Sequence, residues 1–208
     1  MLLIFDCDGV LRSVSWSAMY AAYLAIADHI NKDPAVFWQG VNDFRSWHNN
    51  DWHHNFERMG IARNVDYRPM VQIFHDIYDP SIAKFSWVEE ILDHLAQKQH
   101  VLAVLSGAKS NSVRATLESS LGHFSAILGS DHVEKIKPDP EGIHLIMDKI
   151  GICADDTVMI GDSDADILAG KNAGVKTAGV TWGMADLEEI EKLHPDFIFH
   201  DPMELKAF

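Results

Sequence analysis

A chain of 208 residues, 47% hydrophobic and 23% charged, is long enough for one large domain or for a main domain with a small insertion, and is too apolar to be disordered. Its 31 acidic residues outnumber 17 basic ones, and the net charge of −14 argues against a nucleic-acid-binding protein, which would carry basic surfaces. The apolar runs are too short to cross a bilayer and Met1 opens directly on a core strand, so we expect no signal peptide, no membrane partner and a cytoplasmic location.

The first eleven residues give the strongest local signal. An unbroken apolar run that ends at Phe5 predicts a strand buried on both faces, as in parallel sheets. Asp6 and Asp8 follow at once, and then Gly9, which allows the backbone to turn sharply. Ligands of open α/β sheets bind at the carboxyl ends of the strands, which is where this pair falls. Because two buried carboxylates need a cation or a proton between them, the pattern favours a ligand site over a turn capped by two aspartates.

A helical stretch interrupts the strand pattern after this motif. Apolar residues recur at helical spacing over Trp16–Ile30, about Phe44–Met59 and about Asp66–Tyr78. Asp33 and Pro34 give a further helix-start signal, and we find no strand-like run here. We therefore expect residues 13–84 to form a helical insertion within a domain made of residues 1–12 and 85–208.

Strands and helices alternate in the rest of the chain. The expected strands are Val101–Leu105, Ala126–Leu128, Thr157–Ile160, Thr177–Val180 and Phe197–Phe199, and the expected helices are Ser86–Gln99, about Lys109–Ser119, one that ends at Ile150, one that ends at Ala173, and Met203–Ala207. Strands that alternate with helices of this length predict an α/β fold, a Rossmann-like parallel sheet with helices on both faces.

Polar residues follow three of the expected strands. They are Asp6 with Asp8, Ser106 with Gly107, and Asp162 with Asp166. Parallel strands bring all three groups to one edge of the sheet. Four aspartates without histidine or cysteine at ligand spacing form an all-oxygen site, which suits Mg²⁺ better than zinc or copper.

Two further residues fit an anion at this edge. Ser106 precedes a glycine and a helix start, so its hydroxyl and the nearby backbone N–H groups would face an anion, although a serine there could also serve only as a helix cap. Lys137 lies in Lys-Pro-Asp-Pro, a stiff loop after a short strand. Alone it would be interpreted as a surface lysine, and its setting favours a role in the site.

In order and as a set, these motifs resemble the four motifs of the haloacid dehalogenase superfamily. The motifs are Asp6-Cys7-Asp8-Gly9-Val10-Leu11, the strand end Val104-Leu105-Ser106-Gly107, Lys137-Pro138-Asp139-Pro140, and Gly161-Asp162-Ser163-Asp164-Ala165-Asp166. The most similar subgroup is that of the phosphoglycolate phosphatases and β-phosphoglucomutases, whose helical cap is inserted after the first motif. The resemblance covers the full length and implies a haloacid dehalogenase-like core with a helical cap domain.

The resemblance also implies roles for single residues. Asp6 would be the nucleophile and Asp8 the general acid/base. Mg²⁺ would be held by Asp6, by the backbone carbonyl of Asp8 and by Asp162, while Ser106, Gly107 and Lys137 would contact the phosphate. The role of Asp166 is left open.

In the cap, Gly40–Arg45 resembles a loop that dips towards the active site in this subgroup. Arg45 is then expected to hold a second anionic group of the substrate. Arg12 stands where the family more often has an aspartate or a similar polar residue, and we expect it to line the entrance. The many tryptophans of the cap are interpreted as core packing and its histidines as surface residues. An aromatic substrate pocket, or a second metal site of His53 and Glu57, is the alternative.

The function expected from this resemblance is that of a Mg²⁺-dependent phosphatase. Its partner would be a small phosphorylated metabolite, of the phosphoglycolate or sugar-phosphate type, hydrolysed through an aspartyl phosphate. A phosphomutase and a non-catalytic module that binds a phosphorylated ligand are the alternatives. Asp8 and Asp162 argue against the dehalogenase branch, which needs neither a proton donor nor a metal. The oligomeric state is left open.

Overall fold

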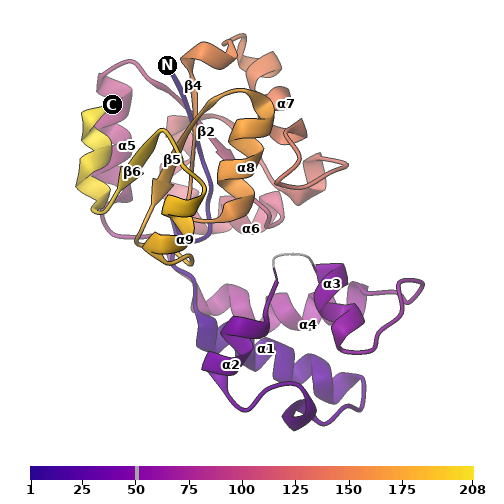
Figure 1. The fold of residues 1–208 in the computed structure, drawn as a ribbon. Helices are drawn as coiled ribbons and strands as arrows, with labels where there is room; N and C mark the ends of the chain where they lie inside the picture. The colour runs from indigo at the N-terminus through magenta and orange to yellow at the C-terminus, as the bar shows by residue number, and fades with distance from the viewer. Residues whose placement is uncertain (50–51) are drawn as a thin grey trace. The chain divides into compact units, whose positions relative to one another are not determined.

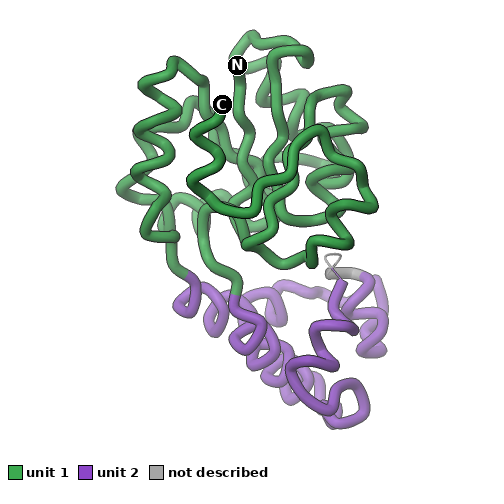
Figure 2. The backbone as a smooth tube through the Cα atoms, turned by 60° about the vertical axis from the view of Figure 1, so that its left-hand side comes forward, with its two compact units in different colours: residues 1–14, 83–208 green, residues 15–82 purple. Residues whose placement is uncertain are grey.

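The computed structural model describes residues 1–49 and 52–208, and for residues 52 and 53 it describes the backbone alone. The described chain forms two compact units. The core unit comprises Met1–Val14 and Ala83–Phe208, and the inserted unit comprises Ser15–Ile82, so the chain passes between them twice (Figure 2). None of the described helices combines the length and the apolar character that spanning a bilayer requires.

The core unit is built on a parallel sheet of six strands in the order β3-β2-β1-β4-β5-β6. The strands are β1 Leu2–Phe5, β2 Val101–Leu105, β3 Phe124–Leu128, β4 Thr157–Gly161, β5 Lys176–Val180 and β6 Phe197–Phe199. The first strand of the chain therefore lies in the middle, between β2 and β4. The expected α/β fold with a parallel sheet is confirmed.

Helices cover both faces of this sheet (Figure 1). They are α5 Val88–Gln97, α6 Ser110–Thr116, α7 Glu141–Ile150, α8 Asp164–Ala173 and α9 Leu187–Lys192, with short 3₁₀ helices at Glu118–His123, Ser130–His132, Ala154–Asp156 and Pro202–Ala207. Helices α5 and α6 pack on one face, and α7 and α8 pack on the other.

The burial of β1 on both faces explains its unbroken apolar sequence. Leu3 and Phe5 pack with α5, while Leu2 and Ile4 pack with α7 and α8, and all four side chains are fully buried. Burying each such side chain contributes about 1.5–3 kcal/mol. The position of β1, and of the residues that follow it, is therefore fixed by the hydrophobic core.

The strand register brings the polar ends of the strands together. Phe5 pairs with Val104 of β2 and with Ile160 of β4. The backbone N–H of Asp6 continues the ladder, because it donates to the Ile160 carbonyl at 2.8 Å. The residues just beyond β1, β2 and β4 therefore reach the same edge, as the sequence predicted.

Helices joined by turns and loops form the inserted unit, and its described residues, 15–49 and 52–82, contain no strand. Its helices are α1 Trp16–His29, α2 Val41–Trp47, α3 Trp52–Arg58 and α4 Arg68–Tyr78, with 3₁₀ turns at Pro34–Val36 and Asp79–Ser81. Its core is aromatic: Tyr23 of α1 has ring contacts with Trp38, Phe44 and Phe74. His48 packs against the same cluster and is half-buried, and this burial lowers its pKa to about 4, so His48 is not the solvated histidine that was expected.

One predicted helix differs from the structure, and one helix was not predicted. The single helix expected over about Phe44–Met59 is divided into α2 and α3, because the buried side chain of Asn55 bonds both the N–H and the carbonyl of Asn49 and holds the chain out of a helix there. Helix α9 was missed. Asp186 begins it with a capping box, in which the Asp186 N–H donates to Glu189 Oε2 at 3.1 Å.

Candidate active site

Asp6 lies at the carboxyl end of β1 with only 6% of its surface exposed. Its Oδ1 is 2.6 Å from the ammonium nitrogen of Lys137. Burial raises the pKa of Asp6 from its ordinary value of 3.8 to about 7, with Lys137 opposing the rise and Asp166 and Asp8 adding to it. The structure therefore places Asp6, whose ionised form is destabilised by burial, beside a cation at the edge of the sheet where ligands bind.

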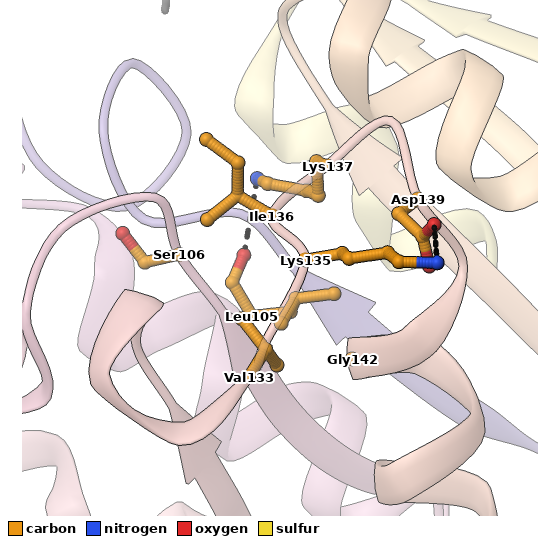
Figure 3. A pocket seen from close by; sticks show the side chains of 8 residues that line it. All are labelled: Leu105, Ser106, Val133, Lys135, Ile136, Lys137, Asp139 and Gly142. Atoms are coloured by element: carbon orange, nitrogen blue, oxygen red, sulfur yellow. Dashed lines mark hydrogen bonds and ion pairs between the residues drawn. The ribbon is translucent and has the colours of Figure 1, made fainter. Parts of the chain in front are cut away.

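Lys137 is buried at the centre of the site and is not a surface lysine. Its Nζ bonds Asp6 Oδ1 at 2.6 Å, Asp166 Oδ1 at 2.5 Å and the Leu105 carbonyl at 3.2 Å, the last of which is drawn in Figure 3. Burial disfavours its charged form, but the two carboxylates outweigh burial and raise the pKa of Lys137 above its ordinary value. The ammonium group is therefore charged at neutral pH.

Asp162 is held by two loops as well as by its own strand end. Its Oδ2 accepts a hydrogen bond from the Met184 N–H at 2.6 Å. A Cβ atom at Gly9 would lie 2.0 Å from that oxygen, and one at Gly183 would lie 2.1 Å from it. Gly9 also has a φ of +78°, which favours glycine. Both glycines are therefore required by the close approach of the Asp162 carboxylate.

Asp166 is the residue whose role the sequence left open. It is fully buried at the start of α8, where Oδ2 accepts hydrogen bonds from the N–H and the hydroxyl of Ser163. Its other oxygen accepts from Lys137 at 2.5 Å. Asp166 thus orients Lys137. The Ser163-Asp-Ala-Asp166 spacing of a capping box was the available sequence signal for its position.

Asp8 and Ser106 complete the edge. The Asp8 side chain is 24% exposed, and Ser106 Oγ lies within 3.4 Å of its Oδ2. Ser106 Oγ also accepts the Ala108 N–H at 3.0 Å, so it closes a short turn, while the N-cap position of α6 belongs to Lys109. The interpretation of Ser106 as only a helix cap is therefore wrong.

Arg12 does not line an entrance, because only 1% of its surface is exposed. Its guanidinium bonds both oxygens of Asp8: Nε lies 2.9 Å from Oδ1 and Nη2 lies 3.0 Å from Oδ2. No regular spacing in the sequence signals this contact, because the pair lies in a loop and not on a helix face.

Gly107 and Arg45 are the remaining residues that the sequence predicted to contact the substrate. Gly107 is exposed directly after Ser106, and a Cβ atom there would meet nothing within 4 Å, so the fold itself does not demand a glycine. Gly40–Arg45 belongs largely to helix α2 and is not a loop, and the Arg45 guanidinium lies 5.5 Å from the ring centre of Trp16. Substrate contact by either residue stays a prediction.

The alternative metal site of the cap includes His53, whose side chain lies outside the described residues.

A cavity of about 10 Å³ adjoins the site (Figure 3). Its lining includes Ser106, Ile136 and Lys137. A cavity of this size admits roughly one water molecule, and not a phosphate ester.

The chemistry of the donors fits a divalent metal ion. Asp6, Asp162 and Asp166 are buried, and each offers a carboxylate oxygen within 4.8 Å of the others. Asp8 adds a fourth carboxylate, and Lys137 and Arg12 form ion pairs with three of the four, Asp6, Asp8 and Asp166. Burial, Asp166 and Asp6 also raise the pKa of Asp162, which indicates that negative charge is incompletely balanced. An all-oxygen set with excess negative charge suits Mg²⁺.

These pKa shifts predict a pH-dependent effect of Mg²⁺ on stability. The folded-state pKa of Asp6 is about 7 against an ordinary 3.8, and that of Asp162 is also raised. Between about pH 4 and 7 these two carboxyl groups therefore bind more protons in the metal-free folded protein than in the unfolded chain, and their contribution to the free energy of unfolding falls as pH rises. Protons also compete with the metal for the carboxylates. We expect Mg²⁺ to raise the melting temperature more at pH 8 than at pH 5.

Thermal unfolding with and without Mg²⁺ at the two pH values measures this effect. The Asp162→Asn variant is the control, because it removes one charged donor and should lose most of the increase at pH 8. An equal increase at both pH values would contradict the assignment of these carboxylates to the metal site.

Comparisons with known proteins identify a family, related sequences and similar folds. The family model of haloacid dehalogenase-like hydrolases matches residues 3–180. Among relatives, pyrophosphatase PpaX of Bacillus velezensis is 27% identical over 206 residues, which cover 98% of this chain and 93% of the relative. Pyrophosphatase PpaX of Oceanobacillus iheyensis is 32% identical over 126 residues, 60% of this chain and 59% of the relative.

Solved structures share the fold. A predicted phosphoglycolate phosphatase from Haemophilus somnus superposes with a TM-score of 0.81 at 22% identity, covering 99% of this chain and 96% of that one. A hydrolase of the haloacid dehalogenase-like family from Streptococcus pneumoniae superposes with a TM-score of 0.80 at 19% identity and the same coverage.

Proposed function

Because this chain belongs to the haloacid dehalogenase-like hydrolase family, we propose that it is a Mg²⁺-dependent phosphatase that hydrolyses a small phosphorylated metabolite through an aspartyl phosphate on Asp6. The observation that carries this proposal is the buried Asp6–Lys137 contact of 2.6 Å beside Asp162 and Asp166, at the carboxyl edge of the sheet. The cytoplasmic location expected from the sequence remains part of the proposal, and cell fractionation would test it.

The first step transfers the phosphoryl group to the protein. The Asp6 carboxylate attacks phosphorus, a P–O bond to Asp6 forms, and the bond to the leaving oxygen breaks. Lys137 offsets the repulsion between Asp6 and the phosphate, and Ser106 and Gly107 offer donors to the phosphoryl oxygens. Asp8 gives its proton to the leaving oxygen. Mg²⁺, held by Asp6, Asp162 and the Asp8 backbone carbonyl, would supply positive charge next to the phosphoryl group.

The second step hydrolyses the aspartyl phosphate and regenerates the enzyme. Asp8, now a carboxylate, takes a proton from water as that water attacks the aspartyl phosphate, so that Asp6 and inorganic phosphate are released. Asp8 Oδ2 lies 3.4 Å from the hydroxyl of Ser106, which we propose to contact the phosphate, and this closeness supports a role for Asp8 in both steps. Asp166 acts on both steps through Lys137, which it holds at 2.5 Å.

A substrate panel tests the proposal. The panel contains pyrophosphate, phosphoglycolate, several sugar phosphates and 4-nitrophenyl phosphate, because relatives and structural neighbours are named for the first two substrates. We expect phosphate release from at least one of these compounds with Mg²⁺, and loss of release with a chelator that added Mg²⁺ reverses.

Three outcomes of the panel would contradict the proposal. Full activity after removal of divalent ions would refute the metal assignment. Product formation that requires a sugar bisphosphate activator, without net phosphate release, would identify a phosphomutase instead. A protein that binds these compounds and turns over none of them would be a binding module.

A further inference from the structure

The contact between Arg12 and Asp8 is not accounted for by the reaction described above. The Arg12 guanidinium is buried and forms two parallel hydrogen bonds, at 2.9 and 3.0 Å, to the two oxygens of Asp8. A bidentate pair of this kind fixes the plane of a carboxylate as well as its position.

The far side of the guanidinium is anchored to a helix. Arg12 Nη1 donates to Ser112 Oγ at 3.1 Å and to Thr116 Oγ1 at 3.0 Å, two hydroxyls one turn apart on α6. The Arg12 backbone is fixed too: its N–H donates to the Cys7 carbonyl at 3.0 Å, and it forms an antiparallel bridge with Lys84. All of these partners belong to the core unit.

The two members of the pair are exposed to very different degrees. Arg12 is 1% exposed, whereas the Asp8 side chain is 24% exposed. A buried ion pair is by itself weak evidence of stabilisation, because desolvation of both charges opposes the attraction. Here the cation lies wholly inside the protein and the carboxylate faces outward, which is the arrangement of a reactive group with a rigid support behind it.

We propose that Arg12 is a positioning residue that holds the Asp8 carboxyl group in the orientation needed for proton transfer to the leaving group. The two bonds from Arg12 occupy one lone pair on each Asp8 oxygen, so the proton that Asp8 gives to the leaving oxygen is carried on a remaining lone pair, away from the guanidinium. This inference rests on the role proposed for Asp8. In this role Arg12 acts through Asp8, to which its guanidinium is bonded. Ser112 and Thr116 set its position in turn, so that α6, which follows the Ser106 loop, is coupled to the acid/base group.

The inference predicts an effect that depends on the leaving group. An alkyl phosphate expels a basic alkoxide, which needs a proton from a well-placed Asp8, whereas 4-nitrophenyl phosphate expels a weakly basic phenolate that does not. The value of kcat/KM reports the phosphoryl transfer to Asp6. For Arg12→Met, we expect the ratio of kcat/KM for alkyl over aryl phosphate to fall by about ten- to a hundredfold, the usual effect of removing a supporting residue.

Two other variants should lower the alkyl-to-aryl ratio by smaller amounts. Arg12→Lys keeps the charge and loses the planar fork, so it should recover only part of the ratio. Ser112→Ala leaves the pair intact and removes one anchor, so it should lower the ratio slightly. In an Asp8→Asn background, Arg12→Met should cause no further fall in the ratio, because the two residues act as a unit.

The matched control is Lys84→Met. Lys84 is a cation on the segment that pairs with Arg12, its side chain is 18% exposed, and it contacts Glu89, Ser119 and Ser120, away from the site. Its loss should lower thermal stability and leave the alkyl-to-aryl ratio unchanged. If Arg12→Met does not fold, Arg12→Lys and Ser112→Ala carry the test.

The outcomes separate this inference from the proposed function. A fall in the ratio for the Arg12 variants, a smaller one for Ser112→Ala and none for Lys84→Met supports it. An unchanged ratio in folded Arg12 variants of an active enzyme overturns it and leaves the phosphatase assignment standing. A wild-type protein that releases phosphate from no compound of the panel overturns the proposed function and the inference with it.

Discussion

Asp6→Asn is expected to reduce phosphate release below detection. An amide oxygen is a poor nucleophile, so the aspartyl phosphate cannot form. The fold should survive the change, because asparagine has nearly the same shape and Lys137 keeps its contact with Asp166 at 2.5 Å. Burial raises the pKa of Asp6 to about 7, so removing this carboxylate should not weaken the metal-free protein at pH 8.

Phosphate release and acid-quench trapping of the phosphoprotein measure this effect. The matched control is Asp164→Asn, the same substitution at an exposed aspartate of the Gly161–Asp166 motif, which bonds only the Ala165 N–H among the contacts described for it. This control should retain turnover and form the phosphoprotein. If Asp6→Asn turned over substrate at a measurable fraction of the wild-type rate, another residue would be the nucleophile.

The positions of Asp6, Asp8, Ser106 and Asp162 could be predicted because local rules suffice for them. An apolar strand followed by a polar residue is visible in the sequence itself, and parallel strands must end at one edge. The position of Asp162 at that edge could be predicted without knowing which residues it contacts. The same rules yielded the parallel sheet and the bounds of β2, which coincide with the expected Val101–Leu105.

Other features depend on contacts between distant residues. Lys137 reaches Asp166 across 29 positions in the sequence, and Arg12 reaches Thr116 across 104. The requirement for Gly183 arises from its closeness to Asp162 and leaves no local pattern. The break between α2 and α3 likewise depends on a buried side chain, that of Asn55. Helix α9 is different, since its capping box was visible in the sequence.

Asp8→Asn is expected to lower kcat/KM for an alkyl phosphate by roughly a hundred- to ten-thousandfold, the range typical of a lost general acid. The asparagine keeps the backbone carbonyl and one oxygen that can accept from Arg12. Ser106 and Lys137 are also unchanged, so competitive inhibition by inorganic phosphate should stay close to the wild-type value. A loss of phosphate binding equal to the loss of rate would instead indicate a damaged site.

The two roles of Asp8 can be separated with 4-nitrophenyl phosphate. Its leaving group needs no proton, so Asp8→Asn should still transfer phosphate to Asp6 at an appreciable rate. Water then lacks its base, and hydrolysis of the aspartyl phosphate becomes slow. Rapid mixing should therefore show a burst of one 4-nitrophenolate per enzyme followed by a slow phase, with phosphoprotein accumulating. Near wild-type steady-state turnover of both substrates would mean that Asp8 is not the acid/base group, and that Arg12 supports a different function of this carboxylate.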